Sequence, residues 1–244
     1  MRSVAESEPV SGRLEVWRAV EAQHVVATMA LVDTADEQRV LEEILEAHKP
    51  AVPAEASRLH YLLFTPFRYP TSEFGSRFRA PHDPGVFYGA DAVRTACAEV
   101  GYWRWRFLMA SPALPELEPR EQTVFQVQLR GPAIDLREPP YLRRQRIWTD
   151  PDDYTGCQAM ARKARTKGVQ IIRYRSVRDP EHGGCAAVLT PAAFARRTPL
   201  KLESWYLAVA RDRVRWFRGR LSGPGRHFEF LMSASTGFDR EPAE

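Results

Sequence analysis

The sequence predicts an α+β fold, with mixed or antiparallel sheets and flanking helices. Helix-forming and strand-forming stretches interleave along the 244 residues without a regular β-α-β rhythm, and no glycine-rich dinucleotide fingerprint follows a predicted strand. The last part of the chain is typical of consecutive antiparallel strands. With 44% hydrophobic residues, a chain of this length buries a core without disulfide or metal support.

Two helices are expected near the N-terminus, over Leu14–Leu31 and Ala35–Ala47. The second opens with a threonine and, three residues later, a glutamate, which is the spacing of a capping box. Prolines that follow the second helix end it, because proline lacks the backbone donor and disfavours helical geometry in the residue before it. We therefore assign residues 1–57 to an N-terminal helical extension and residues 58–244 to the main domain.

The middle of the chain predicts a strand, a loop, a strand and a helix. Leu59–Phe67 is rich in β-forming residues and leads into a loop over Tyr69–Pro84 that contains several prolines and a glycine. A short strand is expected over Gly85–Gly89. Asp91 then serves as the N-cap of a helix over Ala92–Phe107.

The second half of the chain is expected to be mostly strands. One helix is predicted over Asp153–Lys167, with Gly168 in the left-handed cap conformation. An irregular connection over Tyr141–Pro151 precedes it. The predicted strands are Thr123–Leu129, Val169–Tyr174, Cys185–Leu189, Leu202–Ala210, Val214–Phe217 and His227–Leu231.

Composition excludes several function classes. The net charge of +4 is mild and the basic residues are spread along the chain, so direct nucleic-acid binding is not expected. No stretch approaches the roughly 18 apolar residues that span a bilayer, and the N-terminus is acidic and polar, so we expect a cytoplasmic protein without a membrane segment. Three widely separated cysteines indicate neither a disulfide framework nor a metal site.

Arginines, tyrosines and one glutamate gather in a short part of the chain. Arginine grips phosphate with a planar donor fork, and a glutamate on the small-residue face of a helix needs a polar or cationic partner. This mixture suits an anionic, sugar-bearing ligand. Taken singly, the same residues also fit solvated loop arginines, a core tyrosine and a carboxylate in an internal ion pair. The runs are Phe67-Arg68-Tyr69, Gly75-Ser76-Arg77-Phe78, Val86-Phe87-Tyr88 and Ala96-Cys97-Ala98-Glu99.

In this order and spacing, together with Arg175-Ser176 and the run Asp153-Tyr154-Thr155-Gly156-Cys157-Gln158-Ala159 before a helix, these motifs resemble the RES domain. The family is named for its arginine, glutamate and serine. The resemblance covers about Leu59–Thr190. It implies a fold like that of the ADP-ribosyltransferases and an enzyme that degrades NAD+ by phosphorolysis to nicotinamide and ADP-ribose phosphate. NAD+ is then the substrate and inorganic phosphate the co-substrate, with no cofactor and no metal.

The resemblance also implies site residues and a partner. Glu99, Arg77 and Tyr88 map onto catalytic positions, and Arg68, Tyr69 and Ser176 onto binding positions. Many RES proteins are toxins held inactive by a cognate antitoxin, so an antitoxin is an expected partner. The sequence leaves open whether an antitoxin exists and whether the chain forms homo-oligomers.

The chain also departs from the family pattern. Phe78 and Arg79 stand where a tryptophan and an asparagine usually follow the second arginine, which leaves open whether Arg77 or Arg79 faces the ligand. Two other functions remain as alternatives. The first is transfer of ADP-ribose to a macromolecule, and the second is a non-catalytic nucleotide-binding module of the same fold. The aromatic and arginine residues of the run Tyr102–Arg106 are expected to form one packed and one solvated helix face.

Overall fold

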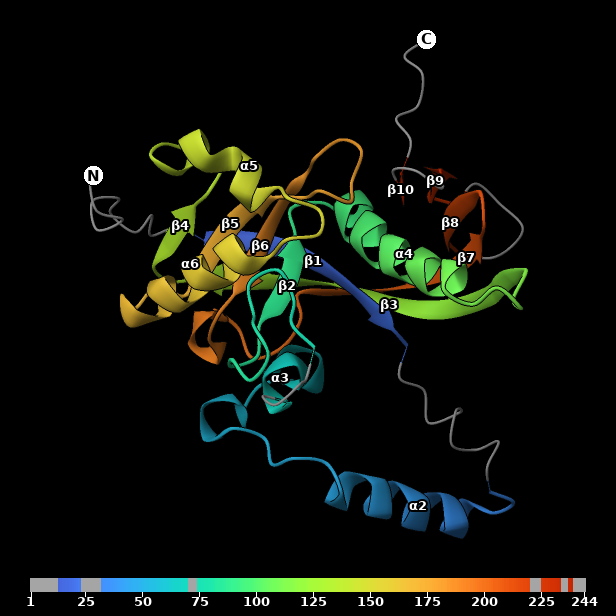
Figure 1. Cartoon of the computed structure of the whole chain (residues 1–244). Helices are drawn as coiled ribbons and strands as arrows, with labels where there is room; N and C mark the ends of the chain where they lie inside the picture. Colours follow the sequence, from blue (N-terminus) through green and yellow to red (C-terminus); the bar gives the residue numbers. More distant parts are fainter. Residues whose placement is uncertain (1–12, 23–31, 70–73, 220–224, 234–236, 239–244) are drawn as a thin grey trace.

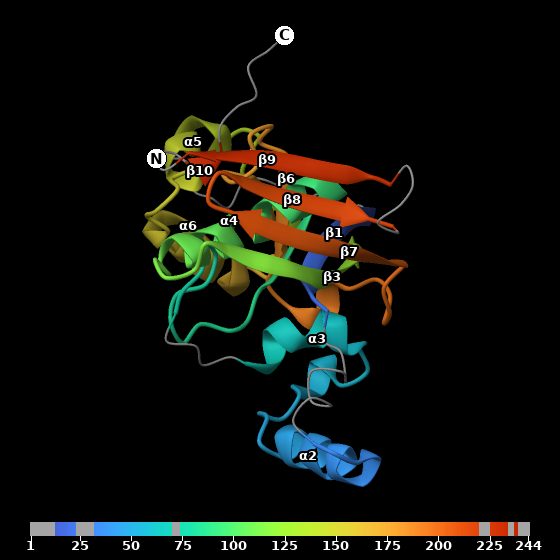
Figure 2. The same cartoon turned by 90° about the vertical axis from the view of Figure 1, so that its right-hand side faces the viewer.

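One ten-stranded sheet organises the fold of this computed structural model, which describes residues 13–22, 32–69, 74–219, 225–233 and 237–238. The strand order is β10-β9-β8-β7-β3-β1-β2-β6-β5-β4 (Figures 1 and 2). The strands are β1 (Arg13–Glu21), β2 (Phe87–Ala90), β3 (Glu116–Arg130), β4 (Ala133–Asp135), β5 (Ile171–Arg175), β6 (Gly184–Val188), β7 (Lys201–Ala210), β8 (Arg213–Arg218), β9 (His227–Ser233) and β10 (Gly237–Phe238).

Helices flank this sheet, so the predicted α+β class is confirmed. The described strands pair antiparallel except β4 and β5, which pair parallel. The helices are α2 (Ala35–Ala47), α3 (Tyr61–Arg68), α4 (Val93–Met109), α5 (Gln145–Trp148) and α6 (Thr155–Thr166), with short 3-10 helices at Ala54–Ala56, Tyr141–Arg144 and Pro191–Ala193.

Helix α4 lies across one face of the sheet and is the central packing element (Figure 1). Tyr102, Trp105 and Leu108 of this helix are buried against Trp205 and other side chains of the neighbouring strands. Gly101 allows the helix to approach β8 closely, because a Cβ at this position would lie 2.7 Å from a methyl group of Val214. The helix is therefore fixed firmly against the sheet.

Strands β1 and β2 share a single residue pair in register, Trp17 with Ala90. By contrast, β1 pairs with β3 along its whole length. Even the single contact between β1 and β2 is close, since a Cβ on Gly89 would lie 2.6 Å from Val16 Cγ2. The sheet therefore opens on either side of this pair.

The predicted helix over Leu14–Leu31 is wrong in its described part, because residues 13–21 form β1 in the middle of the sheet. Residues 23–31 lie outside the described part. A central strand is covered on both faces, and both Val16 and Ala19 are buried. The period-2 alternation that identifies a strand is therefore missing from this stretch. The expected N-terminal extension thus contributes a strand to the main sheet.

The strand expected over Leu59–Phe67 is also wrong, because this stretch contains helix α3. His60 caps the helix by accepting a hydrogen bond from the Leu62 amide. Leu62, Leu63 and Phe67 are buried against the sheet. Tertiary packing on the sheet therefore outweighs the β propensity of this segment.

Asp91 is not the N-cap of α4, which begins after Ala92 without a side-chain cap. The Asp91 carboxylate instead accepts hydrogen bonds from Arg173 at 2.6 Å and from Arg137 at 3.4 Å. Most other predicted elements are confirmed, with bounds that agree within a few residues except at the start of β3, which lies at Glu116 rather than Thr123. These are the helices at Ala35–Ala47, Ala92–Phe107 and Asp153–Lys167 and the strands at Gly85–Gly89, Thr123–Leu129, Val169–Tyr174, Cys185–Leu189, Leu202–Ala210, Val214–Phe217 and His227–Leu231.

Helix α2 lies beyond α3, away from the sheet (Figure 1), and none of its residues is buried. Its capping box at Thr34 and Glu37 is formed as predicted. Arg68 links this helix to the rest of the chain, since its guanidinium lies 2.7 Å from a Glu46 carboxylate oxygen and donates to the Pro50 carbonyl. Within the described residues, no helix is both long and apolar enough to cross a membrane.

Candidate active site

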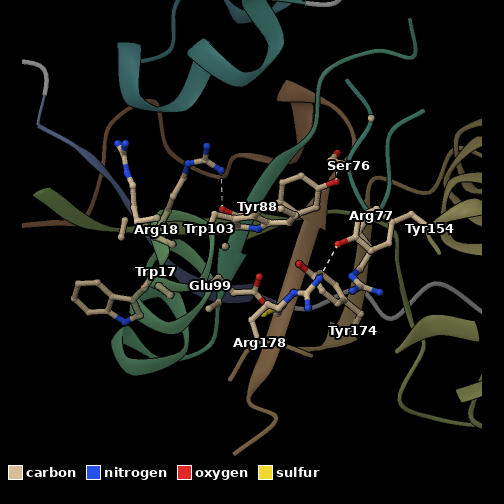
Figure 3. A pocket seen from close by; sticks show the side chains of 18 of the residues that line it. Trp17, Arg18, Ser76, Arg77, Tyr88, Glu99, Trp103, Tyr154, Tyr174 and Arg178 are labelled. Carbon is tan, nitrogen blue, oxygen red and sulfur yellow. Dashed lines mark hydrogen bonds between the residues drawn. The ribbon is translucent and has the colours of Figure 1, made fainter. Parts of the chain in front are cut away.

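A cavity of about 610 Å³ opens beside α4 where β1 and β2 separate (Figure 3). Residues of β1, β2, β5, β6 and α4 line it, together with the loop at Gly75–Arg77, Tyr154 before α6 and Arg178 after β5. Its volume lies in the usual range for small-molecule sites. Arg77, Tyr88 and Glu99, the three residues expected to be catalytic, all line this one cavity.

Glu99 projects from α4 into the cavity. Burial raises the pKa of this carboxyl group, and hydrogen bonding from Ser176 and the charges of Arg77 and Arg178 partly counteract that effect. The Ser176 hydroxyl donates to Glu99 Oε1 at 2.6 Å. The carboxylate thus has one fixed neutral donor, and its other oxygen is not used in that bond.

Ser176 holds Glu99 from behind rather than lining the cavity. It is completely buried, and its oxygen accepts hydrogen bonds from the backbone amides of Arg178 and Asp179. With both amides bound to its oxygen, the hydroxyl proton is directed to the carboxylate. The serine therefore orients Glu99.

Arg77 is buried in the loop wall opposite α4. Its Nη1 donates to the carbonyls of Trp148 at 3.1 Å and Asp150 at 2.8 Å. Its guanidinium also lies over the Tyr154 ring, 4.6 Å from the centroid. None of these contacts is with a carboxylate, and across the cavity the charge of Arg77 acts on Glu99, whose pKa it lowers.

Tyr88 links the strand β2 to the same loop. Its hydroxyl accepts a hydrogen bond from the Phe78 amide at 3.0 Å and shares one with Ser76 Oγ at 2.7 Å. Burial raises the pKa of this phenol, so the group is neutral at physiological pH. Because the hydroxyl is occupied by the loop, the ring is the part of Tyr88 that is available to a ligand.

Arg68 and Tyr69, which were expected to bind the ligand, do not line the cavity. Arg68 is directed toward the Pro50 carbonyl and Glu46 instead. Tyr69 follows α3 and is 42% exposed. Of the two arginines left open by the sequence, Arg77 lines the cavity and Arg79 does not.

Sequence reasoning missed Arg18, which reaches the cavity from β1. Its Nη1 donates to the Tyr88 carbonyl at 2.9 Å, and its guanidinium lies 4.8 Å from the centroid of the Phe87 ring. Its Nε is buried without a hydrogen-bond partner, and among the described residues no carboxylate forms an ion pair with it. Desolvation lowers the pKa of Arg18 to about 10. No sequence signal marked this arginine, because only the pairing of β1 in the sheet brings it to the site.

Arg178 is a second arginine of the cavity that the sequence analysis did not identify. It is buried, and it donates to the Pro151 carbonyl and to the Tyr154 hydroxyl. Its position two residues after Ser176 was a usable signal. In Figure 3, Arg178 lies near Glu99, with Arg77 and Tyr154 on one side of the carboxylate and Trp17 and Arg18 on the other.

Positive charge therefore dominates this cavity. Arg77 and Arg178 act on one half-buried carboxylate, Glu99, and Arg18 lines the same cavity from β1, while Arg104 at the lining is paired with Glu21. Such an arrangement fits a ligand with anionic groups and hydroxyl groups. In the part of the chain that the structure describes, no three His, Cys, Asp or Glu side chains come together as they do in a metal site.

Fold and site together define an α+β protein with a cavity lined by several arginines and one glutamate. The model of the RES domain matches residues 52–210, more than half of the chain. The chain therefore belongs to the RES domain family. The strand β1, with Arg18, lies outside the matched segment.

No curated protein matches the chain. Among solved structures, one similar chain comes from the crystal structure of the M. tuberculosis MbcT-MbcA toxin-antitoxin complex. The two chains are 16% identical, the alignment covers 80% of this chain and 87% of the other, and the TM-score is 0.45.

Proposed function

We propose that this protein degrades NAD+ by cleaving the bond between nicotinamide and ribose, with inorganic phosphate as the preferred acceptor and water as the alternative. The observation that carries the proposal is the half-buried Glu99 carboxylate, which lines one cavity with Arg77 and Arg18 and is held by Ser176. Membership of the RES family supports the same reaction class.

Glu99 stabilises the positive charge that develops on the sugar. Nicotinamide leaves from a carbon already bonded to a cationic nitrogen, so the electron pair of the breaking bond neutralises the leaving group and no general acid is required. The ribose acquires oxocarbenium character as this bond opens. The interaction of a carboxylate with the ribose hydroxyls gains strength as this positive charge develops.

The arginines hold the phosphate groups. Arg18 and Arg77 are fixed by backbone carbonyls rather than by carboxylates, so each keeps its charge for an anionic ligand. An oxygen of inorganic phosphate forms the new bond to the ribose carbon, and the product is ADP-ribose phosphate. Placing this nucleophile beside the cationic carbon removes much of the entropic cost of a bimolecular step.

The loop wall is set by Tyr88. Its bonds to Ser76 and the Phe78 amide fix the loop that carries Arg77, and its ring faces the cavity. We assign to Tyr88 the role of orienting this loop and packing against the nicotinamide ribose. Arg68 and Tyr69 have no part in this proposal because neither lines the cavity.

The test is to incubate the purified protein with NAD+, with and without phosphate, and to separate the products by chromatography. Nicotinamide should appear in both reactions, with ADP-ribose phosphate as the second product only when phosphate is present. Glu99→Gln should be inactive, and Glu181→Gln, at an exposed carboxylate outside the cavity lining, should behave as wild type. NAD+ that stays intact in both reactions, from folded protein, would refute the proposal.

The same experiment separates the two alternatives. ADP-ribose transfer would leave label from NAD+ on a macromolecule rather than in a small product. A binding module would raise its melting temperature with NAD+ and leave the dinucleotide intact over hours.

We further propose that the enzyme acts as a toxin with a cognate antitoxin, because this role is common among RES proteins. Expression of the wild-type chain alone in a bacterial host should lower cellular NAD+ and arrest growth, while expression of Glu99→Gln should do neither. Growth at the normal rate with undiminished NAD+, at equal protein levels, would contradict the toxin role.

A further inference from the structure

Helix α4 presents a line of side chains to the cavity that continues past Glu99. Trp103 and Phe107 follow Glu99 at intervals of four residues, so the three lie on one face of the helix, and all three line the cavity. At about 1.5 Å per residue, they lie roughly 6 and 12 Å from Glu99 along the helix axis. The polar end of the cavity therefore continues into an aromatic end.

Both aromatic side chains are exposed, although their neighbours on the same helix are buried. Trp103 is 52% exposed and Phe107 is 55% exposed, whereas Tyr102 and Trp105 are about 5% exposed. Tyr102 and Trp105 already supply the face of α4 that packs on the sheet. Two large apolar rings side by side at the opening of a polar cavity mark a binding surface rather than a packing requirement.

Arg178 places a positive charge beside this aromatic end. Its guanidinium lies 3.9 Å from the centroid of the Tyr102 ring and 5.6 Å from that of Trp103. The charge of Arg178 also acts on Glu99, whose pKa it lowers. Within the described part of the chain, no carboxylate forms an ion pair with Arg178. The guanidinium is thus near both the carboxylate and the tryptophan and keeps its charge.

We propose that Trp103 and Phe107 form the subsite for the adenine base of the dinucleotide, with Arg178 at the adjoining phosphates. The proposal rests on the function proposed above. A carboxylate, then a cation, then two aromatic rings follow one another in the cavity, and a dinucleotide presents the nicotinamide ribose, the diphosphate and the adenine in that order. Stacking of a base on an aromatic side chain contributes about 1–3 kcal/mol as judged by alanine substitution.

Binding of AMP tests the subsite without any need for catalysis. AMP should raise the melting temperature of the wild-type protein, and Trp103→Ala should weaken AMP binding by roughly 5- to 150-fold, the change that corresponds to one stacked base. Trp103→Phe keeps a ring and should recover most of the affinity. Phe217→Ala is the matched control, since Phe217 is a similarly exposed aromatic residue on β8, outside the cavity lining.

Kinetics with NAD+ give the second test. Trp103→Ala and Phe107→Ala should each raise KM for NAD+ several-fold and leave the acceptor dependence on phosphate as in wild type. The inhibition constant of AMP should rise in Trp103→Ala by the same factor as KM.

These results separate the two proposals. AMP that fails to bind the wild type, or that binds Trp103→Ala as tightly as the wild type, would overturn the subsite. AMP binding that depends on Trp103 in a protein unable to cleave NAD+ would instead support the subsite and refute the proposed reaction.

Discussion

Replacing Arg18 by methionine tests whether its charge serves a ligand or the fold. The pKa of about 10 corresponds to a desolvation cost of about 3 kcal/mol at most, since the residue is only partly buried. The hydrogen bond to the Tyr88 carbonyl offsets this cost by about 1 kcal/mol, and the contact with the Phe87 ring offsets it by about 0.5–2 kcal/mol. These terms nearly cancel, so Arg18→Met should change the free energy of unfolding by less than about 1 kcal/mol, or a few degrees in melting temperature.

The stabilisation of the protein by a bound ligand should change much more in Arg18→Met than the stability of the free protein does. ADP-ribose at about 100 times its Kd stabilises a protein by about 2.7 kcal/mol, which raises the melting temperature of a chain of this size by roughly 5–10 °C. Arg18→Met should lose most of that increase, because it removes a cation that faces the ligand and pairs with no carboxylate of the described residues. Thermal unfolding with and without ADP-ribose measures both effects in one series.

Arg137 supplies the matched control. It is also partly buried, but it pairs with Asp135 at 2.6 Å and with Asp91 at 3.4 Å. Arg137→Met removes the side-chain partner of Asp135, while Asp91 keeps its bond to Arg173, and it should cost about 1–3 kcal/mol while preserving the ADP-ribose effect. If Arg18→Met instead destabilises the free protein as much as Arg137→Met and keeps the full ADP-ribose effect, Arg18 is a structural residue and the reasoning fails.

Three further predictions concern the other site residues. Glu99→Gln should lower nicotinamide release by several orders of magnitude, while the melting temperature at neutral pH stays equal or rises. Burial raises the pKa of the Glu99 carboxyl group, so the stabilising contribution of this group is present below the usual glutamate pKa and is lost as the pH rises through the raised pKa. A clear loss of stability in this variant at neutral pH would contradict this reasoning. Ser176→Ala removes the hydrogen bond that lowers the Glu99 pKa, so the acid limb of the pH profile of kcat/KM should move to higher pH, and kcat/KM should recover at alkaline pH. A pH profile whose acid limb does not move would argue against Glu99 as the ionised group. Arg77→Ala should abolish nicotinamide release, whereas Arg68→Ala should keep kcat and affect only the attachment of α2. A larger loss of activity in Arg68→Ala than in Arg77→Ala would show that Arg68 belongs to the site.

Local sequence signals predicted those elements whose structure is set locally. Helix α2 has a capping box, α6 is followed by a glycine with a φ of +72°, and only Arg211 and Asp212 separate β7 from β8. These features depend on residues within one or two turns of each other. Strand β1 and helix α3 depend instead on packing against distant segments, and their own sequences favoured the wrong structure.

The site residues also divide into those that local sequence predicts and those that depend on distant segments of the chain. Arg77, Tyr88 and Glu99 lie in a short stretch of the chain, so their order and spacing were enough to predict that they share one site, and all three line the cavity. Arg18 reaches them only because β1 lies next to β2 in the sheet. Arg68 has the appropriate charge and a neighbouring position in the sequence, yet its helix directs it to Glu46.

The two walls of the cavity differ in how they are held. Glu99 stands on a long helix whose opposite face is packed into the core, with Gly101 bringing it close to β8. Arg77 and Tyr154 come from connecting segments, and the Arg77 side chain is held by hydrogen bonds to backbone carbonyls and by its contact with the Tyr154 ring. We therefore expect any rearrangement on ligand binding to occur on the side of Arg77, while the helix that carries Glu99 keeps its position.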